Sequence, residues 1–88
     1  MITVKKFSAI WCSPCRMLAP MFNEQVKPQF SGVKFEDIDV DVNPTETTKY
    51  GVTSVPTVII VKDGVELQRF TGVQSKLAYA NAITEAIS

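Results

Sequence analysis

The sequence contains no histidine and only two cysteines among its 88 residues. A structural zinc site takes four ligands, mostly cysteine and histidine, so one copy of this chain cannot build such a site from thiolates and imidazoles. Neither sign of charge is in excess, because nine basic residues balance nine acidic ones. Electrostatic binding to nucleic acid or to an anionic membrane surface is therefore not expected.

Long hydrophobic runs are also missing. No apolar stretch approaches the roughly 20 residues that a membrane-spanning helix needs. Residues 1–7 have neither the long apolar region nor the small-residue cleavage site of a secretory signal. These features predict a cytoplasmic protein with no membrane partner. In the cytosol, a cysteine pair is more typical of a reactive or metal-binding site than of a static disulfide.

The composition is typical of one small globular domain that spans residues 1–88. Hydrophobic residues make up 45% of the chain and charged residues 20%, which is a globular rather than a disordered balance. A domain of this size buries roughly 60–65% of the surface that its unfolded chain exposes, enough for a modest core. We find no repeats or linkers and expect a monomer.

Hydrophobic periodicity predicts four strands and three helices in the order βαβαββα. The predicted strands are residues 2–10, 33–40, 57–61 and 65–71, and the predicted helices are residues 13–30, 44–50 and 76–87. Pro20 is expected to kink the first helix and Pro28 to end it. We expect Met17 and Met21 in the first helix to belong to the core. In the last helix, the inward side chains are predicted to be Leu77, Ala80, Ile83 and Ile87.

This order of elements predicts an α/β fold, with a four-stranded mixed sheet and helices on both faces. A right-handed crossover makes the first two strands parallel, and the hairpin at residues 62–64 adds antiparallel strands. The first strand is expected to lie centrally. Its carboxyl end is then the place where open α/β sheets usually hold their functional sites.

The segment Trp11-Cys12-Ser13-Pro14-Cys15 follows that strand and begins the first helix. Two cysteines at this spacing can close a small disulfide ring and reopen it. Free N–H groups and the helix dipole at the start of a helix lower the pKa of a thiol, so Cys12 is predicted to be the attacking thiol. Cys15, one turn further on, is expected to be more shielded and to act as the resolving thiol. No cofactor is needed beyond this redox-active disulfide, and we expect no metal.

With these features, the chain resembles the thioredoxin family over nearly all of its length. The Cys-X-X-Cys motif is followed about forty residues later by Val-Pro-Thr, a specific combination. The segments that carry the resemblance are residues 11–17, 19–20, 39–44, 50–52, 55–57, 62–64 and Gly72. The resemblance implies a thioredoxin-like fold and a thiol–disulfide oxidoreductase, a protein-disulfide reductase that works through a mixed disulfide at Cys12.

The resemblance also implies a docking surface for substrates. Pro56 would follow a cis peptide bond and lie opposite the dithiol, while Val55 would offer backbone hydrogen bonds to an extended substrate. Trp11 and Gly72 would line the same surface. The implied partners are a thioredoxin reductase-like enzyme and disulfide-containing substrates such as ribonucleotide reductase.

Three features depart from the family pattern. Most thioredoxins begin with an extra strand and helix, for which this chain has no room. Ser13 replaces the usual glycine, and we expect it to cap the helix or to donate to a sulfur, while Pro14 restricts the loop. The family usually has a buried aspartate beneath the cysteines and a lysine on the neighbouring strand. The matching positions in this chain are Lys6 and Asp37, so the two charges are exchanged. We hypothesise that Lys6 and Asp37 form a partly buried, proton-handling ion pair under Cys15; the alternative is two independent charges.

Lys5, in the predicted central strand, is expected to lay its stem over the sheet and to extend its ammonium group into water. Three alternatives to the leading function remain open at this point. They are a glutaredoxin-like, glutathione-coupled reductant, a structural subunit of another enzyme that does not use its thiols, and an oxidant or isomerase, which would require a less reducing potential and an export route.

Overall fold

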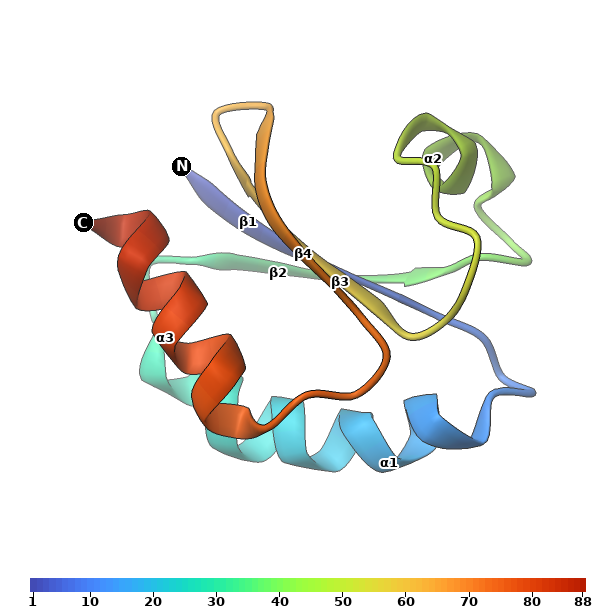
Figure 1. Ribbon diagram of the computed structural model, residues 1–88, viewed down its shortest axis with the longest axis horizontal. Helices are drawn as coiled ribbons and strands as arrows, with labels where there is room; N and C mark the ends of the chain where they lie inside the picture. The colour runs from blue at the N-terminus through green and yellow to red at the C-terminus, as the bar shows by residue number, and fades with distance from the viewer.

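The computed structural model describes all residues, 1–88, as a four-stranded sheet with helices on both faces (Figure 1). The strand order is β2-β1-β3-β4, so β1 lies inside the sheet as predicted. The strands are β1 (Ile2–Ser8), β2 (Lys34–Asp39), β3 (Thr57–Lys62) and β4 (Val65–Thr71). The helices are α1 (Ser13–Met21), α2 (Pro44–Lys49) and α3 (Lys76–Ile87).

The pairing of the strands confirms the predicted mixed sheet. β1 runs parallel to β2 and antiparallel to β3, and β4 is antiparallel to β3. β1 ends at Ser8, two residues earlier than predicted, because the chain turns there. The N–H of Cys12 donates to the carbonyl of Ala9 across this turn (3.2 Å). The start of α1 therefore lies at the carboxyl end of β1, at the opposite end of the molecule from the two termini (Figure 1).

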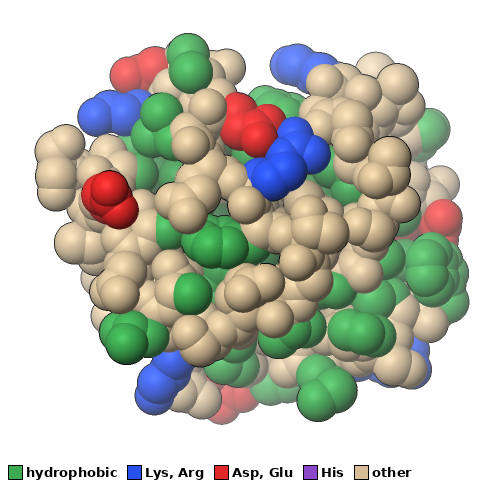
Figure 2. Space-filling view, viewed as in Figure 1, with side chains coloured by type: hydrophobic (Ala, Val, Ile, Leu, Met, Phe, Trp, Pro, Cys, Tyr) green, Lys and Arg blue, Asp and Glu red, His purple; other side chains and the backbone are tan.

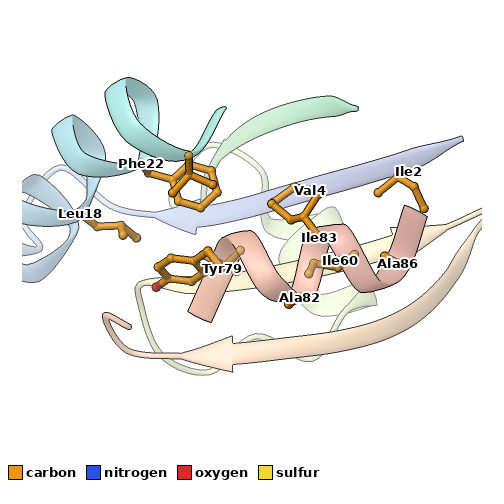
Figure 3. Close-up of a cluster of buried hydrophobic side chains, with 11 residues drawn as sticks. Ile2, Val4, Leu18, Phe22, Ile60, Tyr79, Ala82, Ile83 and Ala86 are labelled. Atoms are coloured by element: carbon orange, nitrogen blue, oxygen red, sulfur yellow. The ribbon is translucent and has the colours of Figure 1, made fainter. Parts of the chain in front are cut away.

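Alternate side chains of the central strands build two separate cores, as a strand buried on both faces requires. On one face, α1 and α3 pack against the sheet, in a cluster that includes Leu18 of α1 and Ile83 of α3 together with Val4 and Ile60 of the sheet (Figure 3). On the other face, a smaller cluster lies on the side of α2 and contains Phe7, Ile38, Ile59 and Val61. No helix of this chain is both long enough and apolar enough to cross a bilayer.

The segment after α1 stays helical but changes its hydrogen-bonding pattern. Pro20 lies inside α1, which continues only to Met21. A π-helical turn, η1 (Phe22–Val26), and a 3₁₀ turn, η2 (Lys27–Gln29), follow. A proline lacks the N–H that would bond four residues back, so the regular pattern is interrupted near it. Pro28 lies inside η2, and the helical segment ends at Gln29, close to the predicted end.

Three predicted core positions are wrong. Met17 is 76% exposed, because Leu18 and Phe22 take the inward positions of this helix. Leu77 and Ile87 of α3 are also exposed. The buried stripe of α3 is instead made by Tyr79, Ala80, Ala82, Ile83 and Ala86.

The orientation of α3 follows from its largest buried side chain. The ring of Tyr79 makes edge-to-face contacts with Phe22 and with Phe70, each at 5.3 Å between centroids. Such pairs are favourable beyond the area they bury. Met21 is half-buried against the same cluster, in agreement with its predicted core role.

Lys5 does not simply extend its ammonium group into water. Its Nζ lies 2.6 Å from Glu36 Oε1 and 3.3 Å from Glu46 Oε1, and it therefore ties β2 and α2 to β1. Burial alone would lower the pKa of Lys5, but the hydrogen bonds to Glu36 and Glu46 outweigh burial and raise it. The hydrogen bond from Lys5 lowers the pKa of Glu36 in turn, despite the burial of that carboxylate.

Substitution of Glu36 by glutamine is expected to lower the free energy of unfolding at pH 7 by about 1 kcal/mol or less. Because the pKa of Glu36 is lowered in the folded chain, its contribution is present above the ordinary glutamate pKa of about 4.3. The contribution is lost as the pH falls through the lower folded pKa. Urea unfolding at several pH values should show the gap between wild type and Glu36→Gln closing below about pH 4.

Glu24→Gln is the matched control, because Glu24 is exposed and forms no ion pair. Equal pH profiles for wild type and Glu36→Gln would show that the Lys5 contacts do not stabilise the fold.

Candidate active site

The two cysteines lie at the connection between the end of β1 and the start of α1. Cys12 occupies the N-cap position of α1, with extended backbone angles (φ −91°, ψ 109°). Its Sγ accepts a hydrogen bond from the N–H of Cys15 (3.2 Å). Pro14 lies in the first turn, where the missing N–H of proline costs no helical hydrogen bond. The two cysteines are joined by a disulfide, with a Cα–Cα distance of 5.3 Å.

This position favours a negative charge on Cys12 once the disulfide is reduced. The first N–H groups of a helix have no partner within it, and the helix dipole adds partial positive charge at the same end. Both effects stabilise a thiolate and make it available as a nucleophile. The arrangement can therefore cycle between a dithiol and a disulfide.

The expected difference in shielding between the two cysteines is not found. Cys12 is 4% exposed and Cys15 is 6% exposed. Both lie in a small apolar cluster with Ala9, against which Val40 and Val55 pack. These neighbours cover Cys12 as well as Cys15, so access to solvent does not distinguish the two sulfurs, and only their positions in the helix differ.

Ser13 neither caps α1 nor donates to a sulfur, contrary to expectation. Cys12 is the N-cap, and Ser13 Oγ accepts a hydrogen bond from Arg16 Nη2 (3.1 Å). Arg16 Nη1 donates to the carbonyl of Ile10 (2.7 Å), which ties the turn before the motif to the first turn of the helix. Sequence analysis missed Arg16, although its spacing of three residues from Ser13 places both on one helix face.

Pro56 lies at a pocket that Cys15 also lines. The Val55–Pro56 peptide bond is cis. Pro56 is buried and lines, together with Cys15, a pocket of about 250 Å³. The N–H of Gly72 donates to the carbonyl of Pro56 (2.8 Å), and Gly72 has a φ of +84°, a conformation that favours glycine.

The backbone of Val55 is free to bind another chain. Its N–H and carbonyl groups form no hydrogen bond within this molecule, while its side chain packs beside Cys12 and Cys15. Free backbone groups of this kind can pair with an extended peptide.

Trp11 stands beside the dithiol and is 65% exposed. Its Nε1–H donates to Asp41 Oδ2 (2.9 Å), which holds the ring in place. Trp11 also lines a second pocket of about 130 Å³, together with Val40, Thr47 and Val55. Asp41 was not among the predicted site residues, because thirty positions separate it from Trp11 and no local spacing connects them.

Lys6 and Asp37 are paired across β1 and β2. Lys6 Nζ lies 3.0 Å from Asp37 Oδ1; the side chain of Lys6 is 7% exposed and that of Asp37 is 64% exposed. Lys6 Nζ also lies 5.2 Å from the centre of the Phe22 ring, a favourable position for a cation. Both residues line the 250 Å³ pocket that contains Cys15, so the cation is on the inner side of the pair and the carboxylate on the outer side.

Charged side chains do not gather into a patch of one sign on the face shown in Figure 2. Acidic and basic side chains are instead interspersed there. No group of three or more cysteine, aspartate or glutamate side chains is arranged to hold a metal ion.

Comparisons with known proteins agree on one family. The sequence model described as Thioredoxin matches residues 1–85. Thioredoxin 1 of Synechococcus elongatus is 38% identical over 77 residues, which cover 88% of this chain and 72% of that protein. A thioredoxin of Mycolicibacterium smegmatis is 37% identical over 84 residues, covering 92% of this chain and 74% of its own length.

Solved structures give the same result. The thioredoxin NaTrxh from Nicotiana alata superposes with a TM-score of 0.88 at 32% identity, covering 96% of this chain and 71% of its own. A thioredoxin of Fasciola hepatica gives a TM-score of 0.77 at 38% identity, covering 98% of this chain and 77% of its own.

Proposed function

Because this chain belongs to the thioredoxin family, we propose that it carries electrons from a partner reductase to protein disulfides, with Cys12 attacking and Cys15 resolving. The chain is a thiol–disulfide oxidoreductase with protein-disulfide reductase activity. The observation that carries the assignment of roles is the Cys12–Cys15 disulfide at the start of α1, with Cys12 as the N-cap.

The proposed cycle balances two electrons. The Cys12 thiolate attacks one sulfur of the substrate disulfide, which forms a mixed disulfide and releases the other substrate sulfur as a thiolate that takes up a proton. Cys15 then loses its proton and attacks the sulfur of Cys12. The second substrate thiol leaves, the Cys12–Cys15 bond closes, and the substrate has gained two electrons and two protons. The reductase returns both to the chain.

The docking surface is formed in this proposal by Trp11, Val55, Pro56 and Gly72. The free backbone groups of Val55 support pairing with an extended substrate segment, and the exposed ring of Trp11 supports apolar contact beside Cys12. Ser13 and Pro14 restrict the loop between the two cysteines: Ser13 through its contact with Arg16, and Pro14 through its fixed backbone.

Lys6 and Asp37 handle charge at Cys15 in this proposal. The ammonium group of Lys6 lines the same pocket as Cys15 and favours its thiolate form, while Asp37 holds the ammonium and reaches solvent. Asp37, neutral Lys6 or water then takes the role of proton acceptor that the family usually gives to a buried aspartate.

The proposed partners are a thioredoxin reductase-like enzyme and disulfide-containing proteins such as ribonucleotide reductase. We place the protein in the cytoplasm, as a monomer with one domain over residues 1–88. The glutaredoxin-like alternative is not favoured, because the comparisons match thioredoxins. The purely structural alternative is not favoured either, because this chain has an intact cysteine pair.

The first experiment tests the roles of the two thiols. After reduction, iodoacetamide is expected to alkylate Cys12 before Cys15 at neutral pH, because the start of the helix favours the thiolate at Cys12. Mass spectrometry of peptides at short reaction times measures the order. Cys15→Ser should retain insulin as a stable mixed disulfide, whereas Cys12→Ser should retain none. Equal alkylation rates, or trapping by Cys12→Ser, would contradict the assignment.

The second experiment tests the ion pair. Lys6→Met is expected to raise the pKa of Cys15 because it removes a nearby cation, and to slow insulin reduction at neutral pH by about 3- to 10-fold. Asp37→Asn should lower the pKa of Cys15, because the ammonium is then no longer neutralised. Thiolate absorbance against pH, in single-cysteine Cys12→Ser backgrounds, gives both values. Lys49→Met, an exposed lysine on α2, is the control; unchanged curves in both test variants would remove the proposal.

The third experiment tests docking. Trp11→Ala is expected to lower the rate constant for insulin reduction by about tenfold, since aromatic anchors dominate contact surfaces. The rate with a small aromatic disulfide should change little. Val65→Ala is the control, because Val65 is similarly exposed (61%) but lies at the far end of β4. A uniform loss toward both disulfides would speak against a docking role for Trp11.

A further inference from the structure

The loop between β4 and α3 is held from inside the core by a tyrosine. The hydroxyl of Tyr79 accepts a hydrogen bond from the N–H of Gln74 (2.9 Å) and donates a longer one to the carbonyl of Gly72 (3.4 Å). Its ring is 1% exposed and lies between Phe22 and Phe70. In Figure 3, the oxygen of Tyr79 points out of the cluster, away from the other labelled side chains.

The loop that Tyr79 holds continues directly into the redox site. The N–H of Gly72 donates to the carbonyl of Pro56 (2.8 Å), and Pro56 lines the pocket of Cys15. Two hydrogen bonds therefore lead from a ring fixed in the core, through Gly72, to the proline that lines the pocket of Cys15. Gly72 joins these two hydrogen bonds, with its N–H bound to Pro56 and its carbonyl bound to Tyr79.

The core does not need the hydroxyl of Tyr79. A phenylalanine at this position would keep the edge-to-face contacts with Phe22 and Phe70 but would make neither hydrogen bond to the loop. Burial raises the pKa of Tyr79, against a smaller opposing effect of the hydrogen bond from Gln74, so the hydroxyl keeps its proton at neutral pH and remains a donor. The polar end of this side chain acts on the loop alone.

We propose that Tyr79 is a positioning residue for protein substrates: its hydroxyl fixes the Gly72–Gln74 loop in the place where it completes the docking surface with Val55 and Pro56. The inference rests on the proposed docking function. When a substrate segment binds between this loop and Trp11, the loop already has its bound conformation. Binding therefore costs less conformational entropy in the loop. Small disulfides, which reach the sulfurs without touching the loop, gain nothing from Tyr79.

The test is Tyr79→Phe in the full chain, with the protein reduced beforehand by dithiothreitol and then freed of it. The second-order rate constant for insulin is expected to fall by about 3- to 10-fold, the range for one lost hydrogen bond. The rate constant for a small aromatic disulfide should stay within about twofold, below the range for one lost hydrogen bond. Amide hydrogen exchange of Gln74 should accelerate, because its N–H loses its acceptor.

Tyr50→Phe is the matched control. It makes the same chemical change, but the hydroxyl of Tyr50 forms no hydrogen bond and its ring packs with Phe7 on the other face of the sheet. This variant should match wild type in both rate constants and in exchange at Gln74.

Two results would overturn the proposal. Unchanged insulin rates and unchanged exchange at Gln74 in Tyr79→Phe would show that the hydroxyl does not hold the loop. An equal loss toward insulin and the small disulfide would show a general effect on the fold. Failure of the docking function itself is recognised separately: Trp11→Ala would then leave the preference for insulin unchanged, whatever Tyr79→Phe does.

Discussion

The structure depends on one local constraint: a thiol must lie where the backbone N–H groups at the start of α1 are without partners. β1 brings the chain to this point from inside the sheet, and the turn at Ala9 places Cys12 as the N-cap. Pro14 lets the helix begin at once, since its first turn needs no donor there. Leu18 of α1 and Phe22 of the following η1 then fix this helical segment on the sheet. The packing of the core therefore fixes the position of the N-terminus of α1, where Cys12 lies.

Sequence analysis predicted the architecture and the reactive pair because both depend on local patterns. Alternating side chains indicate the strands, and a right-handed crossover makes β1 and β2 parallel. The first helix was predicted to continue to about residue 30, and the chain does stay helical to Gln29, although η1 and η2 replace regular α-helix after Met21. The wrong core positions lie in helices that carry more apolar residues than their buried faces can hold. Met17, Leu77 and Ile87 are the apolar residues left exposed. Periodicity alone does not say which of them the sheet covers.

The contacts that sequence analysis missed are those between distant or ambiguous partners. Asp41 meets Trp11 only because β2 lies beside β1. Tyr79 binds Gln74 and Gly72, which are five and seven residues earlier in the loop before α3, a pairing that no regular helical spacing indicates. Ser13 was expected to cap the helix or to donate to a sulfur, but its partner is Arg16. Lys5 was expected to extend into water, yet Glu36 and Glu46 bind its ammonium group. In each case the residue type predicts that a polar group needs a partner, and only the fold selects which one.

The inward position of Lys6 has a consequence for the electrons that the molecule stores. A disulfide is neutral, so in the oxidised chain the only formal anion paired with this ammonium is the exposed carboxylate of Asp37. Two added electrons convert the disulfide into two thiols, and of these Cys15, which lines the same pocket as Lys6, becomes an anion when it loses its proton. A buried carboxylate at the same place would instead repel that charge. In the proposed cycle, the cation of Lys6 therefore stabilises the reduced, ionised form of the protein more than the disulfide form.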